Sequence, residues 1–178
     1  KGSKGNKLAV RLENEPESSR WYPGAGLYRN VHLIVTEDSH VPVWGTQLVT
    51  DKVDENIARV NLKTTWNAAK GSNLADFTIK TEIKDAQGKV VASSSDKLSK
   101  FDQSLFEQTF AVAKPNLWSP ESPYLYTANS TIYQGEKVKD TYTTRFGIRT
   151  IEIIPNKGFF LNGKMVKFKG VCNHHDLG

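Results

Sequence analysis

Apolar and polar residues alternate along most of this chain, and a helical period is conceivable only around residues 67–74. A period of two places successive side chains on opposite faces of a strand, so the alternation predicts β-structure. Gly71 interrupts the helical candidate, which is therefore not expected to form. In the central part, the pattern predicts strands at 43–50, 56–66, 75–84, 89–95, 104–112, 124–133 and 137–146. About seven short strands without helical segments predict an all-β, antiparallel sandwich.

Turn-forming residues separate these segments. Asp85-Ala86-Gln87-Gly88 predicts a hairpin loop in which Gly88 takes a positive φ. The stretch from Leu117 to Thr127 contains Pro120 and Pro123, which fix φ and withhold two backbone donors. The stretch therefore predicts a rigid corner that leads into a strand, and it carries no evident chemistry.

Further strands are predicted on both sides of the central part. Two of them precede it, at 7–13 and 28–36, and a third follows at 149–154. Beyond these, Asn162-Gly163 predicts the tight turn of a hairpin.

The loop at 20–29 carries two adjacent aromatic residues, Trp21 and Tyr22, beside a proline and two glycines that exclude regular structure. One interpretation is that these aromatics pin their own loop. The alternative is a ligand platform, because sugar faces and apolar groups stack on exposed rings.

The formal net charge is +5, and the Lys and Arg residues are spread along the chain without a block of five or more. This pattern favours a mildly basic solvated surface over nucleic-acid binding. Cys172 is the single cysteine, which excludes an intramolecular disulfide. No apolar run is long enough for a transmembrane helix, and the absence of a starting Met indicates a piece of something longer.

The densest polar constellation is Asn173-His174-His175-Asp176, directly after an apolar strand. Two adjacent histidines in a strand point to opposite faces, which disfavours a shared metal ion, so no metal site is predicted. His32 stands alone and is interpreted as a structural or surface residue. No Gly-x-Ser-x-Gly motif, P-loop or dinucleotide fingerprint occurs.

Four motifs, taken together, carry a resemblance to a known family. They are Trp21-Tyr22-Pro23-Gly24-Ala25-Gly26-Leu27-Tyr28-Arg29-Asn30-Val31, Leu117-Trp118-Ser119-Pro120-Glu121-Ser122-Pro123-Tyr124-Leu125-Tyr126, Phe146-Gly147-Ile148-Arg149, and Asn162-Gly163-Lys164 continuing through Gly170-Val171-Cys172 to Asp176. In this order and spacing they resemble glycoside hydrolase family 2, which includes β-galactosidases, β-glucuronidases and β-mannosidases. The resemblance covers the chain end to end and is specific to the family, not to one activity.

The resemblance implies three parts of a longer enzyme. Residues 1–40 would be the end of an N-terminal jelly-roll sugar-binding domain, and residues 41–147 an immunoglobulin-like β-sandwich. Residues 148–178 would be the lead-in and first strand of a truncated (β/α)8 catalytic barrel. The two catalytic glutamates of the family would follow later, so the chain alone is expected to be inactive. The whole protein is expected to be a retaining O-glycosyl hydrolase, most simply a β-galactosidase.

The resemblance also implies contacts to substrate in the whole enzyme. The family's Asn-x-His-acid segment falls on Asn173, His175 and Asp176. An aspartate that contacts the sugar in galactosidases and glucuronidases is replaced by Arg20, which leaves the sugar open because an arginine can bind a carboxylate. The neighbouring Trp21 and Tyr22 complete the predicted contacts.

The expected partners are a carbohydrate substrate and the adjacent jelly-roll and barrel domains, with neither nucleic acid nor membrane. No cofactor is expected in this chain, and a divalent cation is left open for the whole enzyme. A periplasmic or secreted location is favoured over the cytoplasm, because such enzymes often act on external glycans. Two alternatives stay open, which are a stand-alone carbohydrate-binding module using Trp21, Tyr22 and Trp118, and a fibronectin-type interaction sandwich.

Overall fold

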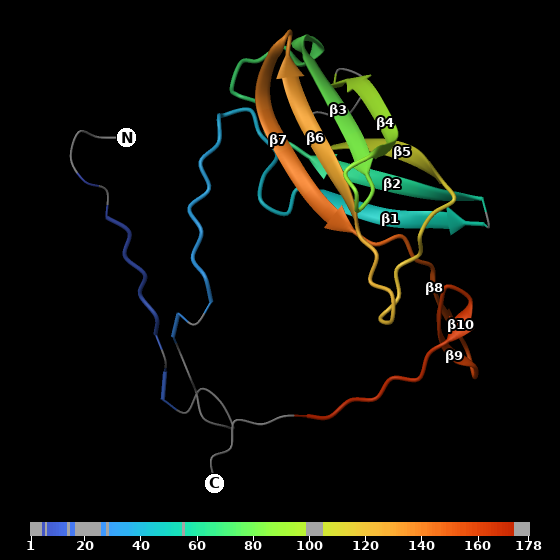
Figure 1. Ribbon diagram of the computed structural model, residues 1–178. Coiled ribbons are helices and arrows are strands. Elements are labelled where there is room, and N and C mark those ends of the chain that lie inside the picture. Colours follow the sequence, from blue (N-terminus) through green and yellow to red (C-terminus); the bar gives the residue numbers. More distant parts are fainter. Residues whose placement is uncertain are drawn as a thin grey trace. The chain divides into compact units, whose positions relative to one another are not determined.

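Seven strands form two antiparallel sheets in the computed structural model, with the orders β1-β2-β5 and β4-β3-β6-β7 (Figure 1). The structure describes residues 5, 7–13, 15–16, 26–27, 29–54, 56–98 and 105–172. The strands of the two sheets are β1 (Thr46–Val53), β2 (Ile57–Thr65), β3 (Phe77–Lys84), β4 (Val90–Lys97), β5 (Leu105–Ala113), β6 (Tyr126–Gln134) and β7 (Lys137–Phe146). One short 3-10 helix, η1 (Leu74–Asp76), precedes β3. The predicted immunoglobulin-like sandwich is confirmed.

Strict alternation of buried and exposed residues explains why these segments form strands. Alternate residues of β2, β3, β5 and β6 are buried, and their neighbours face outward. Two apolar clusters fill the interior. The first contains Val60, Leu62, Ile83, Phe110 and Tyr126, and the second contains Trp66, Phe77, Ile79, Phe106 and Ile132. Trp66 is a core aromatic, and the centroid of its ring lies 5.1 Å from that of Phe77.

A layer of polar side chains separates the two apolar clusters. The strands β2, β3, β5 and β6 each contribute one buried polar residue that lies between apolar ones, and these are Thr64, Thr81, Gln108 and Ser130. We call these four residues the polar layer. Thr81 Oγ1 donates to Gln108 Oε1 over 2.7 Å and lies 2.9 Å from Ser130 Oγ. Gln108 Nε2 donates to Asp96 of β4 over 2.9 Å, which ties the two sheets together through the core.

Three motifs that are far apart in sequence meet at Trp118. The Trp118 amide donates to Ile148 O over 2.8 Å, and Asn162 Nδ2 donates to Trp118 O over 3.0 Å. A Cβ on Gly147 would lie 2.6 Å from Trp118 Cβ, so only glycine fits there. The Arg149 guanidinium lies 5.1 Å from the Trp118 ring centroid. This junction holds a three-stranded unit, β8 (Ile151–Ile154), β9 (Gly158–Leu161) and β10 (Lys164–Met165), in the order β10-β9-β8.

The chain divides into two compact units, residues 1–35 and 36–178. The strands predicted at 7–13 and 28–36 are absent from the described residues of those stretches, which belong to no sheet. Alternation alone does not make a strand, because its backbone donors and acceptors need a partner ladder. The apolar side chains there are accordingly open, with Leu8 81% and Leu33 89% exposed.

Candidate functional site

The six predicted substrate contacts lie outside the described residues. They are Asn173, His175 and Asp176 at one end of the chain and Arg20, Trp21 and Tyr22 near the other. Their role stays a prediction, and the structure does not test whether they come together.

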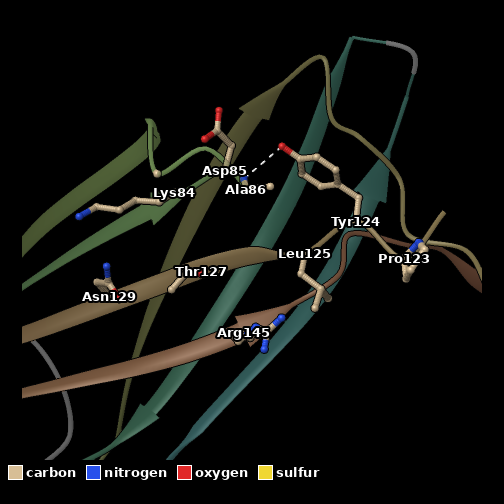
Figure 2. Close-up of a pocket in the computed structure, with 10 residues that line it drawn as sticks. Lys84, Asp85, Ala86, Pro123, Tyr124, Leu125, Thr127, Asn129 and Arg145 are labelled. Atoms are coloured by element: carbon tan, nitrogen blue, oxygen red, sulfur yellow. Dashed lines mark hydrogen bonds between the residues drawn. The ribbon is translucent and has the colours of Figure 1, made fainter.

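A different polar site lies on the outer face of the four-stranded sheet, which we call the outer-face pocket (Figure 2). It has a volume of about 590 Å³. The lining residues used below are Lys84, Asp85, Tyr124, Thr127, Asn129 and Arg145. A second hollow of about 290 Å³ shares Lys84 and Asn129 with it and extends along the same sheet to Tyr133.

Strand pairing places two cations on either side of one threonine. Thr127 of β6 lies opposite Lys84 of β3 and opposite Arg145 of β7. Neighbouring strands are about 4.8 Å apart, so the two cationic residues start about 10 Å apart on one face. Both side chains are long enough to approach the same bound group above Thr127.

The residue pair two positions further along β6 and β7, on the same face, supplies an oriented hydrogen-bond donor. Asn129 lies opposite Thr143, whose hydroxyl donates to Asn129 Oδ1 over 3.0 Å. Because the amide oxygen is engaged, the Nδ2 group is left as a donor toward the pocket. Arg145 is exposed, and its side chain makes no hydrogen bond or ion pair with the described residues. The pocket is therefore rich in donors and suits a ligand that offers acceptors or negative charge.

An aromatic ring forms the other wall. The Tyr124 hydroxyl accepts a hydrogen bond from the Ala86 amide over 3.2 Å, shown dashed in Figure 2, and donates to Gln87 Oε1 over 3.2 Å. These contacts fix the ring against the predicted hairpin loop, in which Gly88 has φ +82°. Asp85 Oδ1 accepts from the Gln87 and Lys89 amides, so one carboxylate oxygen holds the loop closed.

In the second hollow, one acid lies between two lysines. Glu82 lies 2.8 Å from Lys80 Nζ and 3.4 Å from Lys84 Nζ. The hydrogen bond from Lys80, followed by its charge, holds the pKa of the Glu82 carboxyl below its usual range. Glu82 in turn raises the pKa of Lys80 by the same contact. The two lysines thus share one carboxylate, whereas the Arg145 side chain has no acidic partner among the described residues.

Trp118 is not an open stacking platform, although the carbohydrate-module alternative used it. Its ring is packed against Gly147 and carries the Arg149 guanidinium. Within the described ranges, no group of three or more His, Cys, Asp or Glu side chains could hold a metal ion, so a divalent cation has no identified site there. The described part of the chain also contains no helix long and apolar enough to cross a bilayer.

Sequence reasoning did not identify the outer-face pocket. The alternation places Lys84, Thr127 and Arg145 on polar faces, but it does not say which strands are neighbours. Only the pairing β3-β6-β7 brings the three residues to one rung.

Comparison with known proteins identifies relatives over most of the chain. The model of the family described as "Glycosyl hydrolases family 2" matches residues 41–149. "Beta-galactosidase BoGH2A" of Bacteroides ovatus is 44% identical over 97% of this chain and 21% of its own length. "Beta-glucuronidase" of Bacteroides fragilis is 32% identical over 85% of this chain and 22% of its own length.

Solved structures show the same likeness. A glycosyl hydrolase family 2 member from Bacteroides cellulosilyticus matches with a TM-score of 0.80 at 33% identity, over 91% of this chain and 22% of that one. A beta-glycosidase from Bacteroides vulgatus matches with a TM-score of 0.72 at 30% identity, over 89% of this chain and 20% of that one. The chain thus spans about a fifth of the length of the curated relatives just named.

Proposed function

Because this chain belongs to family 2 of the glycosyl hydrolases, we propose that it is a non-catalytic scaffold region of a β-galactosidase that cleaves terminal β-glycosidic bonds with retention. The observation that carries the proposal is the family match over the sandwich, together with the 44% identity to a β-galactosidase. The sandwich would hold a preceding sugar-binding domain and a following catalytic barrel in place.

The chemistry of the described carboxyl groups supports a scaffold role. A retaining glycosidase needs two carboxyl groups about 5 Å apart, and the general acid needs a raised pKa. The described carboxyl groups with a shifted pKa are Glu37, Asp54 and Glu82, and in all three the pKa is lowered. Neighbouring lysines lower the pKa of Glu37 and Glu82. At Asp54 the pKa is lowered by hydrogen bonds from the Asn56 and Ile57 amides. These groups stabilise turns and strand faces and are not poised to donate a proton.

The substrate contacts proposed from the family pattern are Asn173, His175, Asp176, Arg20, Trp21 and Tyr22. Arg20 would decide the sugar, because a guanidinium forms a charge-assisted bidentate pair with a uronate carboxylate but only weaker hydrogen bonds with the hydroxyl groups of a neutral galactoside. The relatives named β-glucuronidase make this the relevant alternative specificity. A periplasmic or secreted location and a divalent cation in the whole enzyme remain part of the proposal.

Hydrolysis assays test the proposal. The 178-residue chain and the longer protein that contains it would each be incubated with aryl β-galactoside and aryl β-glucuronide. We expect the longer protein to release the aryl group from the galactoside and to give the β-anomer first, and the chain alone to be inactive. Hydrolysis by the chain alone would overturn the scaffold role. A preference for the glucuronide that Arg20→Asp reverses would overturn the β-galactosidase assignment.

A further inference from the structure

From the geometry of the outer-face pocket we infer a second, non-catalytic carbohydrate site that binds acidic oligosaccharides carrying a uronic acid carboxylate. It rests on the proposed function only in taking carbohydrate as the ligand class. The site lies wholly within residues 80–145, whereas the substrate contacts proposed above lie outside the described residues.

The charges select an acidic ligand. Of the cations along this face, Lys80 and Lys84 share Glu82, whereas Arg145 has no acidic partner among the described residues. An exposed guanidinium with two parallel N–H groups matches the two oxygens of a carboxylate. Lys84, two strands away on the same rung, adds long-range attraction for that group.

The remaining groups select a sugar over a simple anion. The Tyr124 ring is fixed by hydrogen bonds at its hydroxyl, so it offers an apolar face without a large loss of side-chain entropy. Further along β6, on the other side of Thr127, Asn129 Nδ2 is oriented by Thr143 to donate to a hydroxyl or ring oxygen (Figure 2). Asp85 keeps its Oδ2 atom available as an acceptor for sugar hydroxyls, since the loop uses Oδ1.

The length of the surface suits more than one sugar ring. The second hollow continues from Lys84 and Asn129 to Tyr133 and is lined by Thr131, Thr141 and Thr143. Hydroxyl side chains between two tyrosines provide hydrogen bonds along the strand direction, with a ring at each end. An oligosaccharide can therefore place its carboxylate near Arg145 while neighbouring sugars lie along β6.

Calorimetric titration of the 178-residue chain with tetragalacturonate tests the inference, with neutral galactotetraose as the matched ligand. We expect tetragalacturonate to bind about tenfold more tightly than galactotetraose, and raised salt to weaken its binding. Arg145→Gln should weaken tetragalacturonate binding about tenfold, because it removes the charge-assisted pair while keeping a long polar side chain. Arg59→Gln is the matched control, since Arg59 is an exposed arginine on β2 of the other sheet and should bind as wild type.

Three results would overturn the inference. They are no binding at 10 mM ligand as an order-of-magnitude ceiling, equal affinity of wild type and Arg145→Gln, or inorganic phosphate competing as well as tetragalacturonate does. Tyr124→Phe keeps the ring but removes the hydroxyl bonds that fix it, so it should weaken tetragalacturonate binding less than Arg145→Gln does. If the chain did not bind tetragalacturonate in these titrations, hydrolysis by the longer protein would be unaffected. If the longer protein were inactive, that result would count against the proposed function alone.

Discussion

Two buried threonines differ only in whether their hydroxyl groups are paired. Thr64 and Thr81 are both fully buried on central strands. Thr81 Oγ1 makes two contacts within the polar layer, with Gln108 and Ser130. Thr64 Oγ1 has no hydrogen-bond partner among the described residues. Burial of an unpaired hydroxyl is unfavourable, so the two positions should respond oppositely to loss of the oxygen.

We expect Thr64→Val to raise the free energy of unfolding by about 1 kcal/mol and Thr81→Val to lower it by about 1–3 kcal/mol. Valine keeps the branched shape, so the comparison isolates the hydroxyl group. Urea denaturation of both variants and wild type measures the difference. A shift of both variants in the same direction would contradict the hydrogen-bond assignment.

Alkaline pH should reveal the burial of Tyr126. Its hydroxyl accepts a hydrogen bond from the Asn116 amide over 2.9 Å, and burial raises the pKa of the phenol above its ordinary value. Below about pH 10 both folded and unfolded forms keep the proton, and this stabilising contribution is complete. Above about pH 10 the unfolded chain loses the phenol proton before the folded protein does. The free energy of unfolding therefore falls as the pH rises through the folded pKa.

The Tyr126→Phe variant is expected to lose stability less steeply than wild type above about pH 10, because its ring carries no titrating group. Thermal unfolding followed from pH 8 to about 11.5 would measure both slopes. Parallel slopes for the two proteins would mean that Tyr126 does not carry the alkaline transition.

At the scale of elements, Asn162 attaches the β8–β10 unit to the sandwich. Its backbone takes the left-handed conformation, with φ 50°, at the turn between β9 and β10. Its Oδ1 accepts from the Thr150 amide over 3.0 Å, and its Nδ2 donates to Trp118 O over the same distance. The Asn162 side chain therefore forms hydrogen bonds both to Thr150, next to β8, and to Trp118.

Amide hydrogen exchange can separate these two bonds. We expect Asn162→Ala to speed exchange of the Thr150 amide about tenfold, because its acceptor is lost, and to leave Ser130 in β6 protected. Asn162→Asp keeps the acceptor and tolerates the left-handed backbone, so the Thr150 amide should stay protected. Unchanged exchange at Thr150 in Asn162→Ala would show that the side chain does not hold the unit.

The elements were predictable where local pattern and pairing agree. The seven sandwich strands, the Gly88 loop and the Asn162-Gly163 turn follow from alternation and from residues that tolerate positive φ. Strand ends shifted by a few residues, because the ladder partner decides where pairing stops. The stretches at 7–13 and 29–36 show the limit, since their alternation lacks a paired neighbour in the described residues.

At the scale of the whole molecule, the sandwich should fold without the first unit. The buried residues in the described part of the chain extend from Ser39 to Leu161, and none of them belongs to residues 1–35. We expect a chain that starts at Thr36 to unfold cooperatively, with a Tm within about 4 °C of the full chain. Near-ultraviolet circular dichroism on heating measures this, and loss of the cooperative transition would show that the first unit contributes to the core.

The candidate site was less predictable than the fold, because it depends on which strands become neighbours. Motifs of the family indicated contacts at Arg20 and His175, but these residues lie outside the described part of the chain. The Lys84, Thr127 and Arg145 rung joins three strands across 61 residues of sequence, and no local pattern encodes that pairing. The polar layer was not predicted for a related reason. Alternation shows that a side chain points inward, but it does not show which side chain of the other sheet lies opposite it.

The polar layer also bears on how the chain avoids misaligned sheets. A slip of one residue turns a strand inside out, but a slip of two keeps the same residues inside and is invisible to alternation. If β5 moved by two, Phe106 or Phe110 would face Thr81, and the buried Thr81 hydroxyl would lose Gln108 Oε1 as its acceptor. The Thr81–Gln108–Asp96 hydrogen bonds of the polar layer thus make the alternative alignments costly, in a core whose apolar residues alone would accept several.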